Sequence, residues 1–120
     1  MRRSLLLAAV AGGVATLAVP TAAMAANNSA HCYNVNSIGC TTSSIPAETP
    51  GHWVNYSVDA GPICGTDWRV IDAGNGVVVG SGHVNRNSHA GSWIPGLYGS
   101  YYLRVLNGCP GSQGTISNFD

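Results

Sequence analysis

The sequence predicts an all-β fold, a small antiparallel sandwich or barrel, and three observations support this prediction. Apolar and polar residues alternate from Trp53 onward, so that Val54, Tyr56 and Val58 point to one side of an extended chain. Turn-forming residues interrupt the apolar runs about every eight to twelve residues. Beyond the N-terminal segment, no window of about eleven residues has the apolar stripe of a helix. About six short strands arranged in this way are typical of a sandwich or small barrel.

The expected strands follow one another with recognisable turns between them. The sequence Asp-Ala-Gly-Asn-Gly at 72–76 separates two apolar runs and predicts a hairpin. Residues 80–91 are rich in glycine, serine, asparagine and histidine, so we expect a connection there and not a strand. The predicted strands cover residues 53–58, 67–71, 77–79, 92–94, 99–107 and 115–119.

Residues 1–26 have the features of a cleaved secretory signal peptide. Arg2 and Arg3 form a positive start, an apolar stretch runs from Leu5 to Val19, and small residues lead to a cleavage site of A-x-A type after Ala25 or Ala26. A retained membrane anchor is the alternative interpretation, although glycines and a threonine interrupt the apolar stretch. We therefore expect a secreted, extracellular protein.

The mature chain is long enough for one domain. Residues 27–51 are polar and are broken by Pro46 and Pro50, which predicts an extended N-terminal arm with a short disulfide loop and at most one short strand. Residues 52–120 are expected to form the β-sandwich domain.

Four cysteines remain after the signal peptide, and an even number in an oxidising compartment indicates two disulfides. Of the three possible connectivities we favour Cys32 with Cys40 and Cys64 with Cys109. In the chain-entropy model the longer loop stabilises the fold by about 4 kcal/mol and the shorter by about 2.5 kcal/mol. The Cys64–Cys109 bridge is therefore expected to dominate.

The charge of the chain excludes several classes of partner. Lysine is absent, and the arginines beyond the signal peptide are Arg69, Arg86 and Arg104, scattered along the sequence. A protein that binds nucleic acid needs a basic stripe, and attachment to an anionic membrane surface needs a basic cluster. We therefore expect neither nucleic acid nor, after signal cleavage, a membrane as partner. Neutral hydrogen bonds and aromatic rings are left as sources of affinity.

The aromatic residues give the candidate binding site. Three tryptophans and five tyrosines are many large rings for a chain of this size, and some of them must belong to the core. Trp53 and Tyr102 each alternate out of phase with aliphatic neighbours, so we expect these two rings on an outer sheet face. Exposed rings there would stack on sugars or anchor a protein partner. The alternative is that the arm at 27–51 covers that face.

The segment Gly-Leu-Tyr-Gly-Ser-Tyr-Tyr-Leu-Arg-Val-Leu at 96–106 resembles the late strand of immunoglobulin-like and fibronectin-like bacterial sandwiches. In those folds a tyrosine at the strand start hydrogen-bonds back to the preceding corner. The resemblance implies that Trp68 lies on the neighbouring antiparallel strand, which would bring Cys64 close to Cys109. The expected fold is therefore a small immunoglobulin-like or fibronectin-like antiparallel β-sandwich with two disulfides.

The pair Trp68-Arg69 resembles the start of the Trp-Arg-Tyr turn of small secreted bacterial α-amylase inhibitors of the tendamistat type. Those inhibitors are also small, all-β and held by two sequential disulfides. Here Val70 replaces the tyrosine and the pair follows the third cysteine, whereas in that family the triplet lies inside the first cysteine loop. The resemblance implies that Trp68 and Arg69 belong to a binding site.

No catalytic motif is recognisable, because the chain has no G-x-S-x-G and no C-x-x-C sequence. His83 and His89 could meet Asp67 or Asp72 as metal ligands, but a zinc site needs three or four convergent donors. We expect surface histidines, no catalytic residues, no metal and no cofactor.

The sequence thus predicts a secreted binding module without enzymatic activity, whose partner is an extracellular polysaccharide or protein. Its candidate residues are Trp53, Tyr102, Trp68 and Arg69. One alternative is a proteinaceous inhibitor of a secreted hydrolase such as α-amylase. Another is an antimicrobial or interbacterial toxin, although such proteins are usually cationic in order to reach anionic envelopes.

Overall fold

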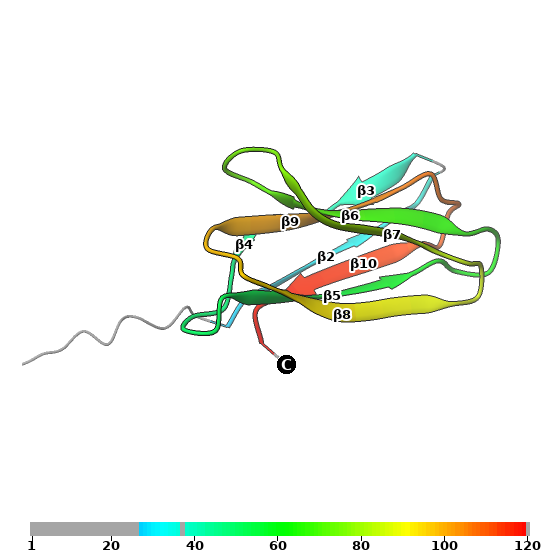
Figure 1. Ribbon diagram of the computed structural model, residues 1–120. Helices are drawn as coiled ribbons and strands as arrows, with labels where there is room; N and C mark the ends of the chain where they lie inside the picture. The colour runs from blue at the N-terminus through cyan, green and yellow to red at the C-terminus, as the bar shows by residue number, and fades with distance from the viewer. Residues whose placement is uncertain (1–26, 37, 120) are drawn as a thin grey trace, which may run out of the picture.

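The computed structural model describes residues 27–36 and 38–119, which form two antiparallel β-sheets packed face to face (Figure 1). The predicted signal peptide lies outside the described residues. No helix capable of crossing a membrane occurs in the described part of the chain. The strands are β2 (Ser29–Tyr33), β3 (Gly39–Thr41), β4 (Ile45–Pro46), β5 (Trp53–Asp59), β6 (Thr66–Asp72), β7 (Val78–Val84), β8 (His89–Pro95), β9 (Ser100–Leu106) and β10 (Gln113–Ser117).

Each sheet combines strands that are distant in sequence. The first sheet has the order β2-β10-β5-β8, and the second has the order β3-β9-β6-β7 with β4 paired to β9. Every pairing is antiparallel. The all-β sandwich predicted from sequence is confirmed.

The core lies between the inner faces of the two sheets and follows the alternation seen in the sequence. Val54, Val58 and Ile116 from the first sheet and Val70, Leu103 and Val105 from the second are almost completely buried. The interior is apolar because each strand directs every second side chain inward. The opposite set of side chains forms the two outer faces of the molecule.

The strand bearing Trp68 lies next to the late strand, as the immunoglobulin-like resemblance implied. β6 and β9 are antiparallel neighbours, with Trp68 opposite Val105. The hydroxyl of Tyr101 accepts hydrogen bonds from the backbone N–H groups of Tyr98 and Gly99, each at 3.0 Å. A tyrosine at the start of β9 therefore fixes the corner before it.

Both predicted disulfides are present, Cys32–Cys40 and Cys64–Cys109. The first joins β2 of one sheet to β3 of the other, and the second joins the β5–β6 loop to the β9–β10 loop. The two bridges lie at the same end of the sandwich, where the buried Asn34 side chain donates a hydrogen bond of 3.1 Å to the carbonyl of Cys109 (Figure 1). This end is cross-linked between the two sheets.

Two segments contain more strand than the sequence indicated. Residues 27–51 were expected to be an arm with at most one short strand, but they supply β2, β3 and β4 to the two sheets. The expected connection at 80–91 is mostly strand, because β7 continues to Val84 and β8 begins at His89. Gly82 lies against the Trp68 ring, where an added Cβ would be 2.9 Å from the indole nitrogen. The glycines of β7 therefore make room for a core ring and do not mark a loop.

Candidate binding surface

The four candidate residues do not converge on one site. Trp53 lies on the outer side of the first sheet, whereas Arg69 and Tyr102 lie on the outer side of the second. Trp68 lies in the core between the sheets. A ligand of ordinary size therefore cannot contact all four, and each outer face has to be considered separately.

Trp68 was a candidate binding residue, and the structure contradicts that assignment. Only 6% of Trp68 is exposed, and its ring packs against Tyr56 with centroids 4.2 Å apart. Trp68 has the inward register on β6 that Val70 shares, whereas its neighbour Arg69 points outward and is exposed. Trp68 and Arg69 are thus on opposite sides of the strand, so they do not form the exposed pair that the inhibitor resemblance implied.

Trp53 has the outward register that the alternation predicted, but it is only partly exposed. Its ring lies over the turn that precedes β5. A Cβ added to Gly51 would be 2.6 Å from the Trp53 indole nitrogen and 2.5 Å from a carboxylate oxygen of Glu48. This turn belongs to segment 27–51, which was expected to be an arm. At Trp53 the segment therefore covers part of the ring, as the alternative interpretation of the sequence proposed.

The outer side of the first sheet faces solvent and is almost uncharged, and we call it the neutral face. Directly opposed residues on antiparallel strands point to the same side, so the register places its side chains in three rows. No residue in these rows is buried, and Asp59 is the one carboxylate among them. The rows are Ser29-Ser117-Asn55-Trp93, His31-Thr115-Ser57-Gly91 and Tyr33-Gln113-Asp59-His89.

Trp93 is the most prominent aromatic residue of the neutral face, with 57% of its surface exposed. It lies on β8, the edge strand of the first sheet, opposite Asn55. The sequence analysis did not select Trp93. The signal was nevertheless present, because Trp93 precedes Ile94, which packs against the core, and the alternation therefore directs Trp93 outward.

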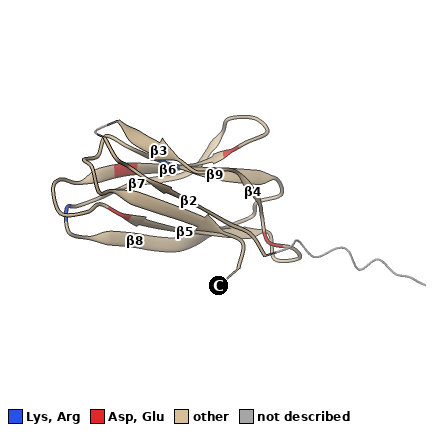
Figure 2. Ribbon diagram, turned by 180° about the vertical axis from the view of Figure 1, so that it is seen from behind, with Lys and Arg blue, Asp and Glu red and all other residues tan. Residues whose placement is uncertain are grey.

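Most of the neutral face consists of hydroxyl, amide and imidazole groups. His31 and Thr115 contact each other across β2 and β10, with 2.8 Å between Nδ1 and the hydroxyl oxygen. Asn55 donates a hydrogen bond of 3.1 Å to the Phe119 carbonyl. Charged residues are sparse over this sheet, as Figure 2 shows. The surface is therefore suited to neutral, hydroxylated ligands.

The outer side of the second sheet has different chemistry, and we call it the arginine face. It consists of the row Thr41-Arg104-Arg69-Ser81, the polar residues Asp67 and His83, and Tyr102 opposite Ile71. Ile71 is 5% exposed although it is outside the core cluster. The guanidinium of Arg104 lies 6.0 Å from the centre of the Tyr102 ring. Two arginines that looked scattered in the sequence are thus direct cross-strand neighbours.

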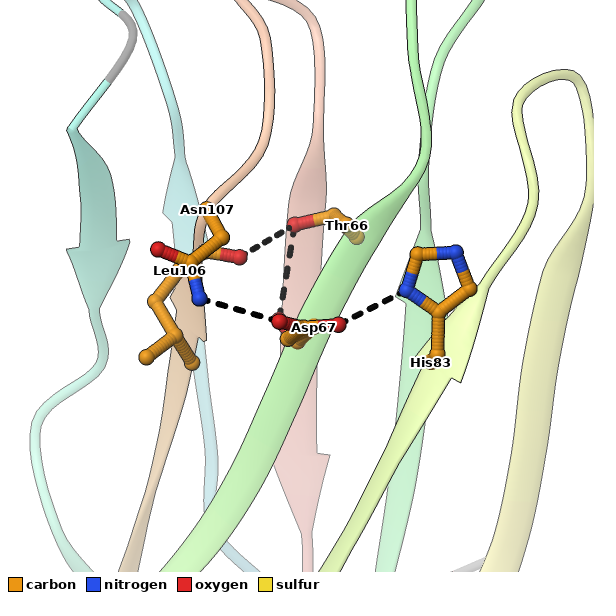
Figure 3. A network of polar contacts seen from close by, with 5 residues as sticks. All are labelled: Thr66, Asp67, His83, Leu106 and Asn107. Carbon is orange, nitrogen blue, oxygen red and sulfur yellow. Dashed lines mark hydrogen bonds and ion pairs between the residues drawn. The ribbon is translucent and has the colours of Figure 1, made fainter.

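Asp67 connects three strands at one edge of the arginine face. One of its carboxylate oxygens accepts a hydrogen bond from the Asn107 amide at 2.9 Å, and the other accepts one from His83 Nδ1 at 2.7 Å (Figure 3). The pKa of Asp67 is lowered, mainly by the hydrogen bond from Asn107 and secondly by the hydrogen bond from His83. The network stabilises the charged carboxylate.

The histidines do not assemble a metal site in the described residues. His83 contacts Asp67, which was one of the two carboxylates considered as its neighbour in the sequence analysis. His89 lies on the other sheet, opposite Asp59. Within residues 27–36 and 38–119, no group of three or more His, Cys, Asp or Glu side chains could hold a metal ion.

The comparisons with known proteins give distant structural likenesses alone. No protein-family model matches the chain, and no curated protein matches its sequence. A chain in the crystal structure of PirA is 16% identical, with 75% of this chain and 90% of that chain covered and a TM-score of 0.49. The tobacco streak virus coat protein is 9% identical, with coverages of 85% and 90% and a TM-score of 0.35. At these values neither likeness indicates what this protein binds.

Proposed function

We propose that this protein is a secreted binding protein without enzymatic activity that attaches to a neutral extracellular polysaccharide through the neutral face. The observation that supports the proposal is the exposure of Trp93 in a row with Asn55, Ser117 and Ser29. A large ring at the edge of a hydroxyl-rich sheet surface is the central feature of the proposed site.

The chemistry of this surface matches the chemistry of a sugar chain. A pyranose ring has an apolar C–H side that stacks on an indole, and its hydroxyls exchange hydrogen bonds with neutral side chains. The exposed hydroxyls of Ser29 and Ser57 lie in the two rows nearest Trp93. The succession of solvent-facing rows suits an extended polymer that contacts several rows in turn.

Secretion is part of the same proposal. Two disulfides are compatible with an oxidising compartment outside the cytosol, where such bridges form and persist. The features of the first 26 residues are those of an export signal. A protein with these properties would meet polysaccharides of a cell wall or of the surrounding medium.

A pull-down with insoluble polysaccharides tests the proposal. The mature protein is mixed with cellulose, chitin and purified cell wall, and the bound fraction is measured after sedimentation. We expect binding to at least one polymer and its loss in Trp93→Ala. The matched control is Tyr102→Ala, which removes an outward ring from the opposite sheet and should leave binding intact.

Thermal melts separate lost binding from lost folding. Because Trp93 is 57% exposed, its truncation should leave the melting temperature nearly unchanged. Binding that survives in Trp93→Ala but disappears in Tyr102→Ala would place the site on the other sheet. The absence of binding to every polymer by the folded wild-type protein would reject polysaccharide as the partner.

A further inference from the structure

Arg69 and Arg104 form a pair of like charges that has no ion-pair partner among residues 27–36 and 38–119. They are directly opposite each other on β6 and β9, an arrangement in which Cβ atoms are about 5 Å apart. Both residues are exposed. In the part of the chain that the structure describes, the one ion pair is between His83 and Asp67. Two like charges in this position oppose folding, because they repel each other across the strands.

The nearest carboxylate does not neutralise the pair. Asp67 lies two residues before Arg69 on the same side of β6, but its two oxygens already accept hydrogen bonds from Asn107 and His83. The influence of Arg69 on the pKa of Asp67 is the smallest of the causes that act on it. On the other side, Arg104 lies beside Tyr102, whose ring supplies no negative group. The guanidinium donors of the pair are therefore directed to solvent.

We propose that Arg69 and Arg104 form a second binding site, on the arginine face, that takes the carboxylate groups of an acidic polysaccharide. The planar guanidinium presents paired N–H donors that match the two oxygens of a carboxylate. Bound carboxylates would remove the repulsion between the arginines. This site is independent of the proposed function, because it uses the opposite sheet and ligands of another charge.

The surroundings of the pair favour a polysaccharide over other anionic polymers. Thr41 and Ser81 lie at the two ends of the same cross-strand row, so exposed hydroxyls flank the guanidinium groups. Arg104 and Thr41 also line a shallow hollow of about 180 Å³ between β3 and β9. Nucleic acid is disfavoured, because its affinity needs many phosphate contacts along a basic stripe. The described residues contain three arginines and four carboxylates, so affinity for an acidic chain has to come from local contacts with the arginine pair and not from a long-range field.

Calorimetric titration with oligogalacturonate tests the second site. We expect the wild-type protein to bind it at low salt and the double variant Arg69→Gln/Arg104→Gln to bind at least about tenfold more weakly, since charged hydrogen bonds are lost. Arg86→Gln is the matched control, because Arg86 is an exposed arginine in the β7–β8 turn and should bind as the wild type does. The double variant should melt at the same temperature as the wild type or higher, because the repulsion is removed.

Further variants and further ligands in the same titration define the chemistry that the site recognises. Arg69→Lys/Arg104→Lys keeps the charge but removes the forked donors, so it should also weaken binding. Trp93→Ala should bind oligogalacturonate normally, which separates this site from the neutral face. The proposal is overturned if the wild-type protein does not bind, if Arg86→Gln is weakened equally, or if dextran sulfate or single-stranded DNA is preferred over oligogalacturonate.

Discussion

On the neutral face Trp93 is 57% exposed among small polar residues, whereas on the arginine face Ile71, which also has an outward register, is only 5% exposed. Both residues lie on the side of their strand that faces away from the sandwich core. The difference lies in what surrounds them. Ile71 is in the middle of its sheet and opposite Tyr102 and Val78, whereas Trp93 is on an edge strand.

The comparison shows that alternation along a strand determines the side of the sheet to which a side chain points, but not how exposed that side chain is. Exposure depends on neighbours contributed by other strands, and those neighbours follow from sheet order. Arg69 and Arg104 illustrate the same dependence, because strand order makes neighbours of two residues that are distant in the sequence. The chemical character of each face is therefore a property of the assembled sheet.

The largest expected effect is the loss of stability when the core residue Trp68 is truncated, compared with the loss for Trp93 on the neutral face. Trp68→Ala should reduce the free energy of unfolding by about 3 to 5 kcal/mol, because it empties the space between β6 and the Tyr56 ring. Trp93→Ala should cost less than about 1 kcal/mol. Urea unfolding of the two variants measures both values. Equal losses would show that Trp93 is structural and would remove the contrast between the two positions.

The second-largest expected effect is the loss of stability when one of the two disulfides is removed. Replacing Cys64 and Cys109 with alanine should cost about 4 kcal/mol, and replacing Cys32 and Cys40 about 2.5 kcal/mol, because the first pair closes the longer loop. Denaturant melts of the two double variants, under conditions in which the remaining bridge stays oxidised, give the comparison. A larger loss from the short bridge would contradict the loop-entropy explanation.

The smallest effect concerns the polar network of the arginine face. The folded protein lowers the pKa of Asp67 below its ordinary value of 3.8, so its charged form stabilises the fold above that pH. This contribution is lost as the pH falls through the lower pKa of the folded state. The side chain of Asp67 is 41% exposed, so solvent screening keeps the contribution below about 1 kcal/mol.

Asp67→Asn therefore should destabilise the protein slightly at neutral pH, and the difference from the wild type should vanish at pH values below the folded-state pKa. Unfolding by urea at a series of pH values measures this difference. Thr115→Val removes a polar contact from the neutral face without removing a charge, so its effect should not depend on pH in the same acidic range. A difference between Asp67→Asn and the wild type that grows toward acidic pH would contradict the assigned direction.

Local patterns predicted the features that depend on one or two strands. The alternation around Val54 and Val58 located β5, and the turn at 72–76 located the hairpin of β6 and β7. Of the three possible cysteine connectivities the favoured one is present, and the immunoglobulin-like resemblance implied the nearness of Cys64 and Cys109. These features were accessible because alternation, turn residues and loop length act over short stretches of chain.

Features that depend on contacts between distant segments were not predicted. Gly82 looked like a loop residue because its role is to admit the Trp68 ring from another strand. The polar segment 27–51 carries little apolar pattern, since β2 and β3 are edge strands, each paired on one side only. The outward direction of Trp93 was accessible from the alternation, but its position on an edge strand and the pairing of the two arginines depend on strand order. Their significance appears only when strand order is known.

The position of β10 has a consequence for the order in which the strand pairings form during folding. β10 lies between β2 and β5 and pairs with both, so Tyr33 obtains its partner Gln113 only when nearly all of the described chain is available. A chain that ends before residue 113 has no strand to join β2 to β5. Pairings of such long range form slowly, because the loop between them must close first. The joining of β2 to β5 is therefore a late step in the folding of this chain, whereas the pairings of the second sheet do not depend on β10.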